Sequence, residues 1–248
     1  MKTLDSRVAL VTGASSGIGE ATAVALAEAG ARVAIAARRR DRLDELANRL
    51  RKLGAEPLVL EADLLDEHEA QRIVAETEAR YGRLDILVNN AGVMYLEPVA
   101  DADLGRWRRM LELNVLSLIA STQAALRGMR ARGSGDIVNI ASTAGRVANP
   151  NGAGYSATKF GVVAFSEALR REVHRDGVRV SVVEPGAVAT ELRDHIGNPA
   201  VKEAIETWAE SLRQLQPADI AEAILFCVTR PSHVSINEVL MRPTDQER

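Results

Sequence analysis

Short apolar runs alternate along the chain with longer segments in which apolar residues recur at helical spacing. Val8 to Val11 and Val33 to Ala36 are continuously apolar, as in strands whose two faces are both buried. After the second run, Leu43, Leu46 and Leu50 share one face of a helix. The alternation therefore predicts an α/β fold in which helices cover both faces of a parallel sheet.

The same alternation continues to the end of the chain. Besides these two runs, we expect strands at 57–62, 84–89, 136–141, 178–183 and 238–241, and helices at 17–29, 40–53, 66–81, 103–132, 155–175 and 217–228. Right-handed crossovers between such units give a doubly wound sheet. No linker rich in Pro, Gly or Ser interrupts the pattern, so a single domain over residues 1–248 is predicted.

Residues 187–216 are the irregular exception. They contain Gly197, Pro199 and an amphipathic stretch at 201–215, between two regular elements. A long insertion with short helices of its own is typical of a lid over an active site. The alternative is a helical hairpin on the surface, and we favour a helical substrate lid.

The composition excludes several classes of protein. With 46% hydrophobic residues the chain is too apolar to be disordered, and a net charge of -3 gives no electrostatic reason to expect nucleic acid or an anionic membrane as a partner. No stretch of about 18 apolar residues could span a membrane, and the polar N-terminus lacks a signal-peptide pattern. Cys227 is the single cysteine, so we expect a reducing compartment, the cytoplasm.

A glycine cluster follows the first strand and opens the first helix. Between Thr12 and Gly19 the glycines stand at 13, 17 and 19, which is not the common G-x-G-x-x-G spacing. The physical requirement is the same, because glycine lets the backbone approach a pyrophosphate that the helix N-terminus attracts. A plain strand–helix turn is the alternative. We expect a cofactor site formed by Gly13, Ser15, Ser16, Gly17, Ile18 and Gly19.

The end of the second strand indicates which dinucleotide binds. A site for NAD usually has an acidic residue there, but this chain has Ala37 followed by Arg38, Arg39 and Arg40. Guanidinium groups can bind a 2′-phosphate in bidentate fashion. A solvated helix start is the alternative, although the helix dipole disfavours cations at that end. We therefore predict NADP(H) as the cofactor, with Arg38 as the best candidate to bind its 2′-phosphate and Arg39 as the second.

Polar residues also follow the third and fourth strands. Asp63 is placed to bind an adenine amino group, and Asn89 to Gly92 close the fourth strand. Ligands of open α/β sheets bind at this carboxyl edge, although asparagine could equally stabilise a turn there. The predicted cofactor-binding residues of this region are Asp63, Leu64, Asn90, Ala91 and Gly92.

Tyr155 and Lys159 stand four residues apart on a predicted helix and therefore share one face. A nearby cation lowers the pKa of a phenol by favouring the phenolate, which would bring the Tyr155 pKa closer to neutral pH. Ser142 lies just past the fifth strand and can donate a hydrogen bond to a carbonyl oxygen. A Tyr-x-x-x-Lys pair alone is common by chance. Its weight here comes from its combination with the glycine cluster, the Asn-Asn-Ala-Gly turn and Ser142.

Together these motifs make the chain resemble the short-chain dehydrogenase/reductase family over essentially its whole length. The resemblance is carried by Thr12–Gly19, Asp63, Asn89–Gly92, Asn114, Ser142, Tyr155, Lys159, Pro185-Gly186 and Thr190. It implies a Rossmann-like sheet of seven strands and a homotetramer or homodimer. Residues 240–246 are similar to a bacterial NADP-preferring subgroup that includes clavulanic acid dehydrogenase and enzymes that oxidise 3-hydroxy acids.

The resemblance also implies residue roles. Tyr155 would donate a proton to the substrate carbonyl oxygen, and Ser142 would hydrogen-bond the same oxygen. Lys159 would lower the Tyr155 pKa and bind the nicotinamide ribose. Asn114 would hold a water behind Lys159, the alternative being a polar residue tolerated within a long helix. The nicotinamide would be bordered by Pro185, Gly186, Val188 and Thr190.

The substrate pocket is the part that the sequence determines least. We expect it to include Met94, Ser142, Ala144, Gly145, Gly186 and Leu192, with Asn149, His195 and Trp208 as further candidates. Arg146 or Arg193 could receive a substrate carboxylate, or either could be a solvated surface charge. No cluster of His, Cys, Asp or Glu has metal-ligand spacing, so no metal is expected.

The leading interpretation is an NADP-dependent oxidoreductase that interconverts a small ketone or aldehyde and an alcohol. The alternatives are oxidation of a 3-hydroxy (amino) acid with NADP, an NADP-sensing regulator without catalysis, and an isomerase or dehydratase of sugar nucleotides. The intact Ser142, Tyr155 and Lys159 argue against a pure sensor. A chain of 248 residues leaves no room for the larger substrate domain of sugar-nucleotide enzymes.

Overall fold

The computed structural model describes residues 3–247. Within them seven strands form one parallel sheet in the order β3-β2-β1-β4-β5-β6-β7. The strands are β1 (Val8–Thr12), β2 (Arg32–Ala37), β3 (Leu58–Glu61), β4 (Ile86–Asn89), β5 (Gly135–Ile140), β6 (Val178–Pro185) and β7 (Glu238–Met241). The doubly wound, seven-stranded fold class predicted from the apolar runs and the family resemblance is confirmed.

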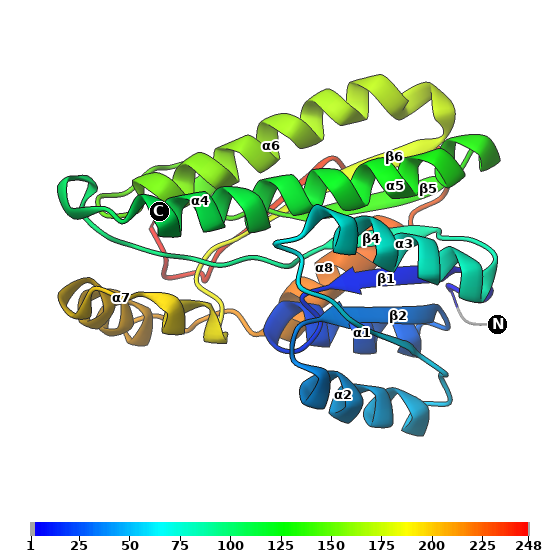
Figure 1. The fold of residues 1–248 in the computed structure, drawn as a ribbon, viewed down its shortest axis with the longest axis horizontal. Helices are drawn as coiled ribbons and strands as arrows, with labels where there is room; N and C mark the ends of the chain where they lie inside the picture. Colours follow the sequence, from blue (N-terminus) through cyan, green and yellow to red (C-terminus); the bar gives the residue numbers. More distant parts are fainter. Residues whose placement is uncertain (1–2, 248) are drawn as a thin grey trace.

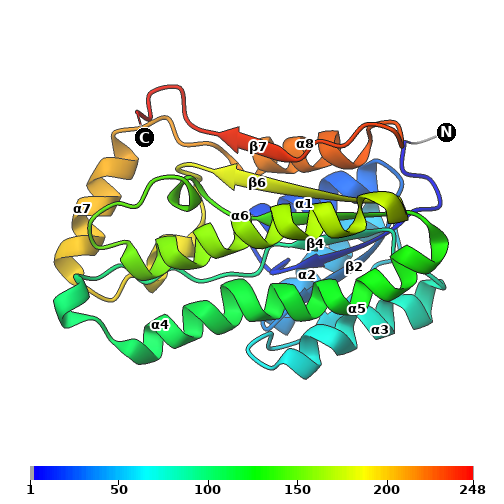
Figure 2. The ribbon, with the colours of Figure 1, turned by 90° about the horizontal axis from the view of Figure 1, so that it is seen from above.

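Helices cover both faces of this sheet (Figures 1 and 2). They are α1 (Gly17–Glu28), α2 (Arg40–Lys52), α3 (Glu67–Tyr81), α4 (Leu104–Leu111), α5 (Ser117–Arg132), α6 (Ala153–Val173), α7 (Pro199–Glu210) and α8 (Pro217–Val228). Helices α1, α2 and α8 contribute to one hydrophobic core, and α3, α4, α5 and α6 to the other. None of the described helices is long and apolar enough to cross a membrane.

Successive residues of a strand belong alternately to these two cores. Leu10 packs in the core on the side of α3 and α5, while Ala9 and Val11 pack on the side of α1 and α8. All three are fully buried, as expected for parallel strands covered on both faces. The two cores hold the carboxyl ends of the strands in a row, and this row carries the cavity described below.

The single helix expected at 103–132 is interrupted. α4 ends at Leu111, a π-helical turn covers Glu112–Leu116, and α5 begins at Ser117. The wide turn presents Asn114 to the segment after β4, where Oδ1 accepts from Val93 N at 2.8 Å and Nδ2 donates to Val93 O at 2.9 Å. Such turns are frequent at functional sites. Helical spacing of apolar residues does not reveal one widened turn.

Residues 187–216 contain a short 3-10 helix (Glu191–His195) and then α7. Helix α7 lies beyond the carboxyl ends of the strands, far from the N-terminus (Figure 2). Asn198 caps this helix by accepting a hydrogen bond from Val201 N. The position suits a cover over that edge of the sheet, while the function of the segment as a substrate lid stays a prediction.

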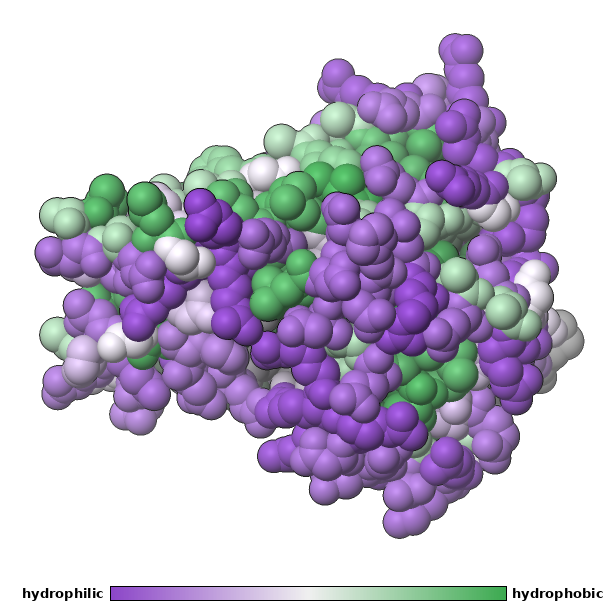
Figure 3. Space-filling model, in the orientation of Figure 1, coloured by the Kyte–Doolittle hydropathy of each residue, from purple (hydrophilic) through white to green (hydrophobic). Residues whose placement is uncertain are grey.

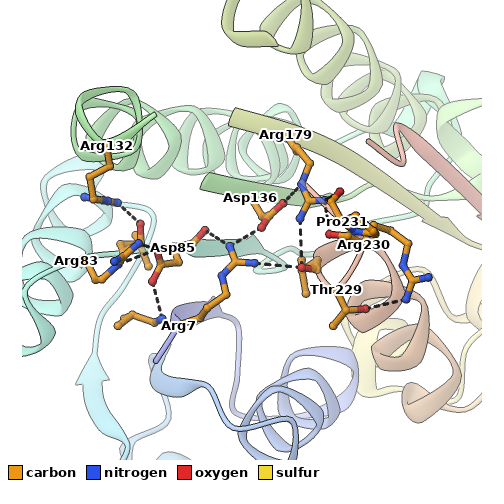
Figure 4. Close-up of polar contacts among 12 residues, drawn as sticks. Arg7, Arg83, Asp85, Arg132, Asp136, Arg179, Thr229, Arg230 and Pro231 are labelled. Carbon is orange, nitrogen blue, oxygen red and sulfur yellow. Dashed lines mark hydrogen bonds and ion pairs between the residues drawn. The ribbon is translucent and has the colours of Figure 1, made fainter. Parts of the chain in front are cut away.

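Ion pairs fasten the opposite edge of the sheet (Figure 4). Asp136 on β5 pairs with Arg7, which precedes β1, and with Arg179 on β6 at an N–O distance of 2.6 Å. Asp85, just before β4, accepts a hydrogen bond from Val8 N at 2.9 Å. The Asp136 and Asp85 side chains are 6% and 3% exposed. Charges with little access to water therefore join the amino ends of four strands.

We expect Asp136→Asn to lower the free energy of unfolding by about 3 kcal/mol, because it leaves two guanidinium groups facing an uncharged amide in a buried place. Urea unfolding followed by circular dichroism measures the loss. Asp44→Asn is the matched control: Asp44 pairs with Arg40 at the surface, and its replacement should cost less than about 0.5 kcal/mol. Equal effects of the two substitutions would contradict the importance of the buried pair.

Candidate active site

A cavity of about 690 Å³ opens along the carboxyl ends of the strands. It begins at the glycine turn after β1, passes the ends of β2, β3 and β4, and continues along the loops after β5 and β6 to the segment 187–216. Ligands of open parallel sheets bind at this edge, next to the point between β1 and β4 where the strand order reverses. The volume is that of an ordinary cofactor or small-molecule site.

The glycine turn allows close backbone approach. Gly13 has φ +64°, and a Cβ there would lie 2.8 Å from Asn90 Nδ2. A Cβ on Gly19 would overlap the Gly13 carbonyl oxygen. The residues of the turn that line the cavity are Gly13, Ser15, Ser16, Gly17 and Ile18. Gly19 does not line it and serves the packing beneath the turn, which differs from its expected place on the cofactor surface.

The turn after β1 is bonded to the turn after β4. The Thr12 hydroxyl oxygen accepts hydrogen bonds from Asn90 N at 3.0 Å and from Ala91 N at 3.1 Å. In return, Asn90 Nδ2 donates to Thr12 O at 2.9 Å. Asn89 is buried instead in the interior, where its Nδ2 donates to the Thr122 hydroxyl at 3.0 Å. Asn90 therefore shapes the cavity wall, and Asn89 ties β4 to α5.

The arginines after β2 differ in their surroundings. Arg39 donates to Ser16 Oγ at 2.8 Å and forms an ion pair of 2.8 Å with Glu191 of the lid. Arg38 lines the cavity and has no hydrogen bond or ion pair within residues 3–247. Arg40 lies outside the cavity wall and pairs within α2. Among the described residues, Arg38 is thus the unpaired arginine at this end of the cavity.

Ser142, Tyr155 and Lys159 meet on one wall of the cavity. Tyr155 and Lys159 are buried near the start of α6, one helical turn apart. Lys159 Nζ donates to the Ile140 carbonyl oxygen at 2.8 Å and lies 5.7 Å from the centre of the Tyr155 ring. The Ser142 hydroxyl oxygen accepts a hydrogen bond from Ala144 N at 3.1 Å. The end of β5 therefore positions both the serine and the lysine.

Burial favours the neutral forms of both titratable groups. It raises the pKa of Tyr155 to about 12, against a smaller opposing effect of the Ser142 hydroxyl. It also lowers the pKa of Lys159 to about 8. Burial is thus the dominant influence on the phenol pKa in this structure, and the expected lowering by Lys159 stays a prediction. Tyr155 is held as a phenol, which is the form that donates a proton.

Comparison with known proteins agrees with this arrangement. A family model described as short chain dehydrogenase matches residues 7–200. The chain belongs to the short-chain dehydrogenase family. An uncharacterized oxidoreductase of Staphylococcus aureus (strain MW2) is 35% identical over 243 residues, which cover 98% of this chain and 100% of that protein. The glycine betaine reductase ATRR of Emericella nidulans is 40% identical over 245 residues, which are 98% of this chain but only 19% of that protein.

Solved structures share the fold over nearly the full length of this short-chain dehydrogenase. The closed form of a serine dehydrogenase complexed with NADP+ is 35% identical with a TM-score of 0.89, and the match covers 97% of this chain and 96% of that one. The alcohol dehydrogenase of the archaeon Thermococcus sibiricus, complexed with 5-hydroxy-NADP, is 30% identical with a TM-score of 0.87 and covers 98% of both chains. The family to which the sequence motifs point is confirmed.

An ion pair fixes the loop that carries Ser142 in this short-chain dehydrogenase. Arg146 Nε donates to Glu184 Oε1 at 2.8 Å, and Arg146 Nη2 donates to Glu184 Oε2 at 2.9 Å. The Glu184 side chain is fully buried and immediately precedes the Pro185–Gly186 segment of the cavity wall. Arg146 also pairs with Glu238 on β7. Its charge is therefore used within the protein, and it does not line the cavity as a receptor for a substrate carboxylate.

Most of the other predicted site residues do line the cavity. Its wall includes Asp63, Leu64, Asn90, Ala91, Gly92, Met94, Ala144, Asn149, Pro185, Gly186, Val188, Thr190, Leu192, Arg193, His195 and Trp208. Asn114 stands behind the wall, where its Nδ2 also donates to the Thr158 hydroxyl at 3.2 Å. Gly145 is not on the wall either: a Cβ there would lie 2.9 Å from the Lys159 carbonyl oxygen. Gly145 therefore packs the serine loop onto α6, and its expected contact with substrate is not supported.

Several wall residues lie outside the motifs that define the site, among them Tyr95, Arg109 and Gln246. Gln246 Oε1 accepts a hydrogen bond from Ala187 N at 2.9 Å, so the C-terminal segment braces the loop after β6. The tertiary fold alone brings these two residues together. Similarity of residues 240–246 to a subgroup of the family is the one signal in the sequence that points to this segment.

We expect Arg146→Met to lower the free energy of unfolding by about 3 kcal/mol, because it leaves the buried Glu184 carboxylate without its cation. The double variant Arg146→Met/Glu184→Met should recover most of this loss, since an apolar pair of similar volume removes the unpaired charge. Urea unfolding of both proteins measures the difference. If both variants unfold at the same urea concentration, the charge of the pair is not what stabilises the loop.

Proposed function

We propose that the protein is an NADP(H)-dependent oxidoreductase that interconverts a ketone or aldehyde and an alcohol. The observation that carries the proposal is that Ser142, Tyr155 and Lys159 line the same cavity as the glycine turn and Arg38. One end of the cavity thus suits a phosphorylated dinucleotide, and its middle holds a proton donor. The two NADP-type complexes among the similar structures support the choice of cofactor.

The first half of the cavity would hold the dinucleotide. Residues 13–18 open α1, whose N-terminus attracts a pyrophosphate. Arg38 would bind the 2′-phosphate, and its lack of any other partner among the described residues supports this role. Asp63 would bind the adenine amino group, and residues 185–190 would border the nicotinamide. When bound, the cofactor supplies or accepts the hydride.

The residues around the reacting carbonyl would handle the proton. Tyr155 would donate its hydroxyl proton to the carbonyl oxygen as that oxygen gains negative charge. Ser142 would hydrogen-bond the same oxygen and stabilise its charge. Lys159, protonated below about pH 8, would bind the hydroxyl groups of the nicotinamide ribose. Asn114 would hold a water behind Lys159.

A second candidate reaction is the oxidation of a 3-hydroxy (amino) acid with NADP. The charges of the cavity favour it, because Arg109 and Arg193 both line the wall. Among the described residues of the wall, the acidic ones are Asp63, which is assigned to adenine, and Glu191, which is paired with Arg39. The substrate end is therefore basic, which suits a substrate that carries a carboxylate.

Arg193 is the cation best placed to test this second reaction. It is half-buried, and its partners are neutral oxygens, at 2.9 Å from Gln214 Oε1 and 3.4 Å from Val188 O. A guanidinium that lacks a carboxylate partner retains most of its attraction for one. The serine dehydrogenase among the similar structures is named for a 3-hydroxy amino acid, which is consistent with this candidate.

We also propose that the protein is a homotetramer or homodimer in the cytoplasm. Large apolar side chains are exposed on α4, the π-helical turn, α6, α8 and β7, namely Leu104, Leu111, Leu116, Phe160, Phe226 and Leu240. Apolar residues gather over α4, α5 and α6 in the space-filling view (Figure 3). Exposed apolar patches of this kind mark contact surfaces. The single, buried Cys227 supports a reducing compartment.

Tyr155→Phe should abolish turnover and leave the affinity for NADPH within about twofold, because it removes the proton donor but not the phosphate turn. The assay is a panel of ketones, aldehydes and 3-hydroxy acids, with the cofactor absorbance as readout and NADPH fluorescence for binding. A wild-type protein that binds NADPH and turns over no substrate would favour the sensing regulator. Near-normal turnover by the variant would reject Tyr155 as the acid.

The two reaction directions should differ in their dependence on pH. Because the Tyr155 pKa is raised to about 12, the phenol that reduction needs is present throughout the range from about pH 6 to pH 8. The phenolate that oxidation needs is scarce there and increases about tenfold per pH unit. We therefore expect kcat/KM to be flat for reduction and to rise for oxidation. A plateau of the oxidation rate near pH 7 would mean that the Tyr155 pKa is low in the working enzyme.

Arg193→Gln should raise KM about tenfold for substrates that carry a carboxylate and leave KM for uncharged ketones unchanged, because it removes a charged hydrogen bond to that group alone. Steady-state kinetics on the substrates found in the panel measure both effects. Equal KM changes for charged and uncharged substrates would show that Arg193 acts through the shape of the lid.

A further inference from the structure

All three nitrogens of the Arg39 guanidinium group have partners. Nε and Nη2 both donate to Ser15 Oγ at 3.2 Å, and Nη2 also donates to Ser16 Oγ at 2.8 Å. Nη1 forms an ion pair with Glu191 Oε2 at 2.8 Å. One side of the guanidinium group is thus bound to the glycine turn, and the other side to the first turn of the lid.

The lid reaches the glycine turn through two adjacent residues. Thr190 covers Gly17 so closely that a Cβ on the glycine would lie 3.0 Å from the Thr190 methyl carbon. Next to it, Glu191 lines the cavity beside the phosphate turn. The hydrogen bond from Arg39 holds the pKa of the Glu191 carboxyl below its ordinary value, so this group is a carboxylate at neutral pH. A negative charge therefore lies where the sequence predicts a phosphate site.

Arg38 and Arg39 are neighbours in sequence, line the same cavity and differ in what holds them. Arg38 has no partner within residues 3–247, whereas Arg39 must release Glu191 before it can turn to a ligand. A 2′-phosphate would attract both guanidinium groups. It would also repel the Glu191 carboxylate, because two anions would then share one cation.

We propose that Glu191 sets the cofactor specificity by competing with the 2′-phosphate for Arg39. The proposal rests on the proposed use of NADP(H). The Glu191 carboxylate pairs with Arg39 when no cofactor is bound, and the 2′-phosphate of NADP(H) displaces it. NAD(H) carries a hydroxyl at that position and leaves the ion pair in place. Glu191 therefore lowers the affinity for NADP(H) alone, and phosphate binding releases the first turn of the lid from the glycine turn.

The test is the ratio of the dissociation constants for NADH and NADPH, measured by nicotinamide fluorescence on the full chain. Glu191→Gln should bind NADPH up to about fivefold more tightly, which is the upper end of the range for one half-exposed ion pair, and should bind NADH as the wild type does. The ratio should therefore rise by the same factor.

Two further variants distinguish competition for Arg39 from a general effect of negative charge on the segment 187–216. Glu203→Gln is the matched control, because Glu203 is an exposed carboxylate of α7 that lies outside the cavity wall. It should leave both dissociation constants unchanged. In an Arg39→Met background, Glu191→Gln should no longer change the ratio, since Arg39, the guanidinium group that pairs with Glu191, is then absent and Arg38 has no ion pair with Glu191.

Weaker NADPH binding by Glu191→Gln would overturn the proposal. It would mean that the Arg39–Glu191 ion pair stabilises the bound cofactor. An equal change for both cofactors, or an effect that persists in the Arg39→Met background, would overturn it too. A wild-type ratio near one would instead reject the proposed preference for NADP(H), and the change of the ratio in Glu191→Gln would still decide the competition. A wild type that binds neither cofactor would overturn both.

Discussion

The hydrogen bonds between Thr12 and Asn90 are the constraint on which the rest of the site depends. β1 and β4 are neighbours in the sheet, although the chain passes through β2 and β3 between them. A crevice forms between their ends because the connection that follows β1 leads to β2 on one side, and the connection that follows β4 leads to β5 on the other side. The Thr12 hydroxyl accepts two backbone N–H groups there, and Asn90 Nδ2 also donates to Gly13 O at 3.2 Å. The turns on the two sides of the crevice are thus one bonded unit that can present backbone groups to a pyrophosphate.

The proton-transfer residues obey a different constraint, which is the energetic cost of burial. Tyr155 and Lys159 are both buried. Burial raises the pKa of Tyr155 and lowers that of Lys159, and each shift favours the neutral form of the group. Lys159 Nζ donates a hydrogen bond of 2.8 Å to the Ile140 carbonyl oxygen, which offsets part of the cost of burying the amine. In the proposed reaction the protonated phenol is available to a developing alkoxide at neutral pH, although its raised pKa makes it a weaker acid than an exposed tyrosine. Burial therefore keeps the phenol populated at neutral pH and the phenolate scarce.

The parts of the molecule that the sequence predicts are those that depend on residues close together in the chain. The strands, the glycine turn and the Tyr155–Lys159 pair each lie within one element or one turn, so periodicity and spacing reveal them. The π-helical turn at Glu112–Leu116 cannot be predicted in this way, because a widened turn leaves the apolar spacing almost unchanged. The Arg146–Glu184 ion pair cannot be predicted from spacing either, because the two residues lie on different elements. The effect of burial on the Tyr155 pKa is also beyond the sequence, since spacing gives the distance to a cation and says nothing of desolvation.

The lid can vary without disturbing the sheet, because its two ends are bonded to each other at its base. Ala189 N donates to Leu215 O at 2.9 Å, and Leu215 N donates to Ala187 O at 3.0 Å. Between these points α7 buries just Val201 and Ala209, so the packing of the fold depends little on its sequence. Loops and short helical segments at this edge of a sheet are where selectivity can vary while the scaffold stays fixed. Glu191 lies near the start of the same segment and contacts the proposed phosphate site, so in the proposed enzyme one segment sets both cofactor choice and substrate access.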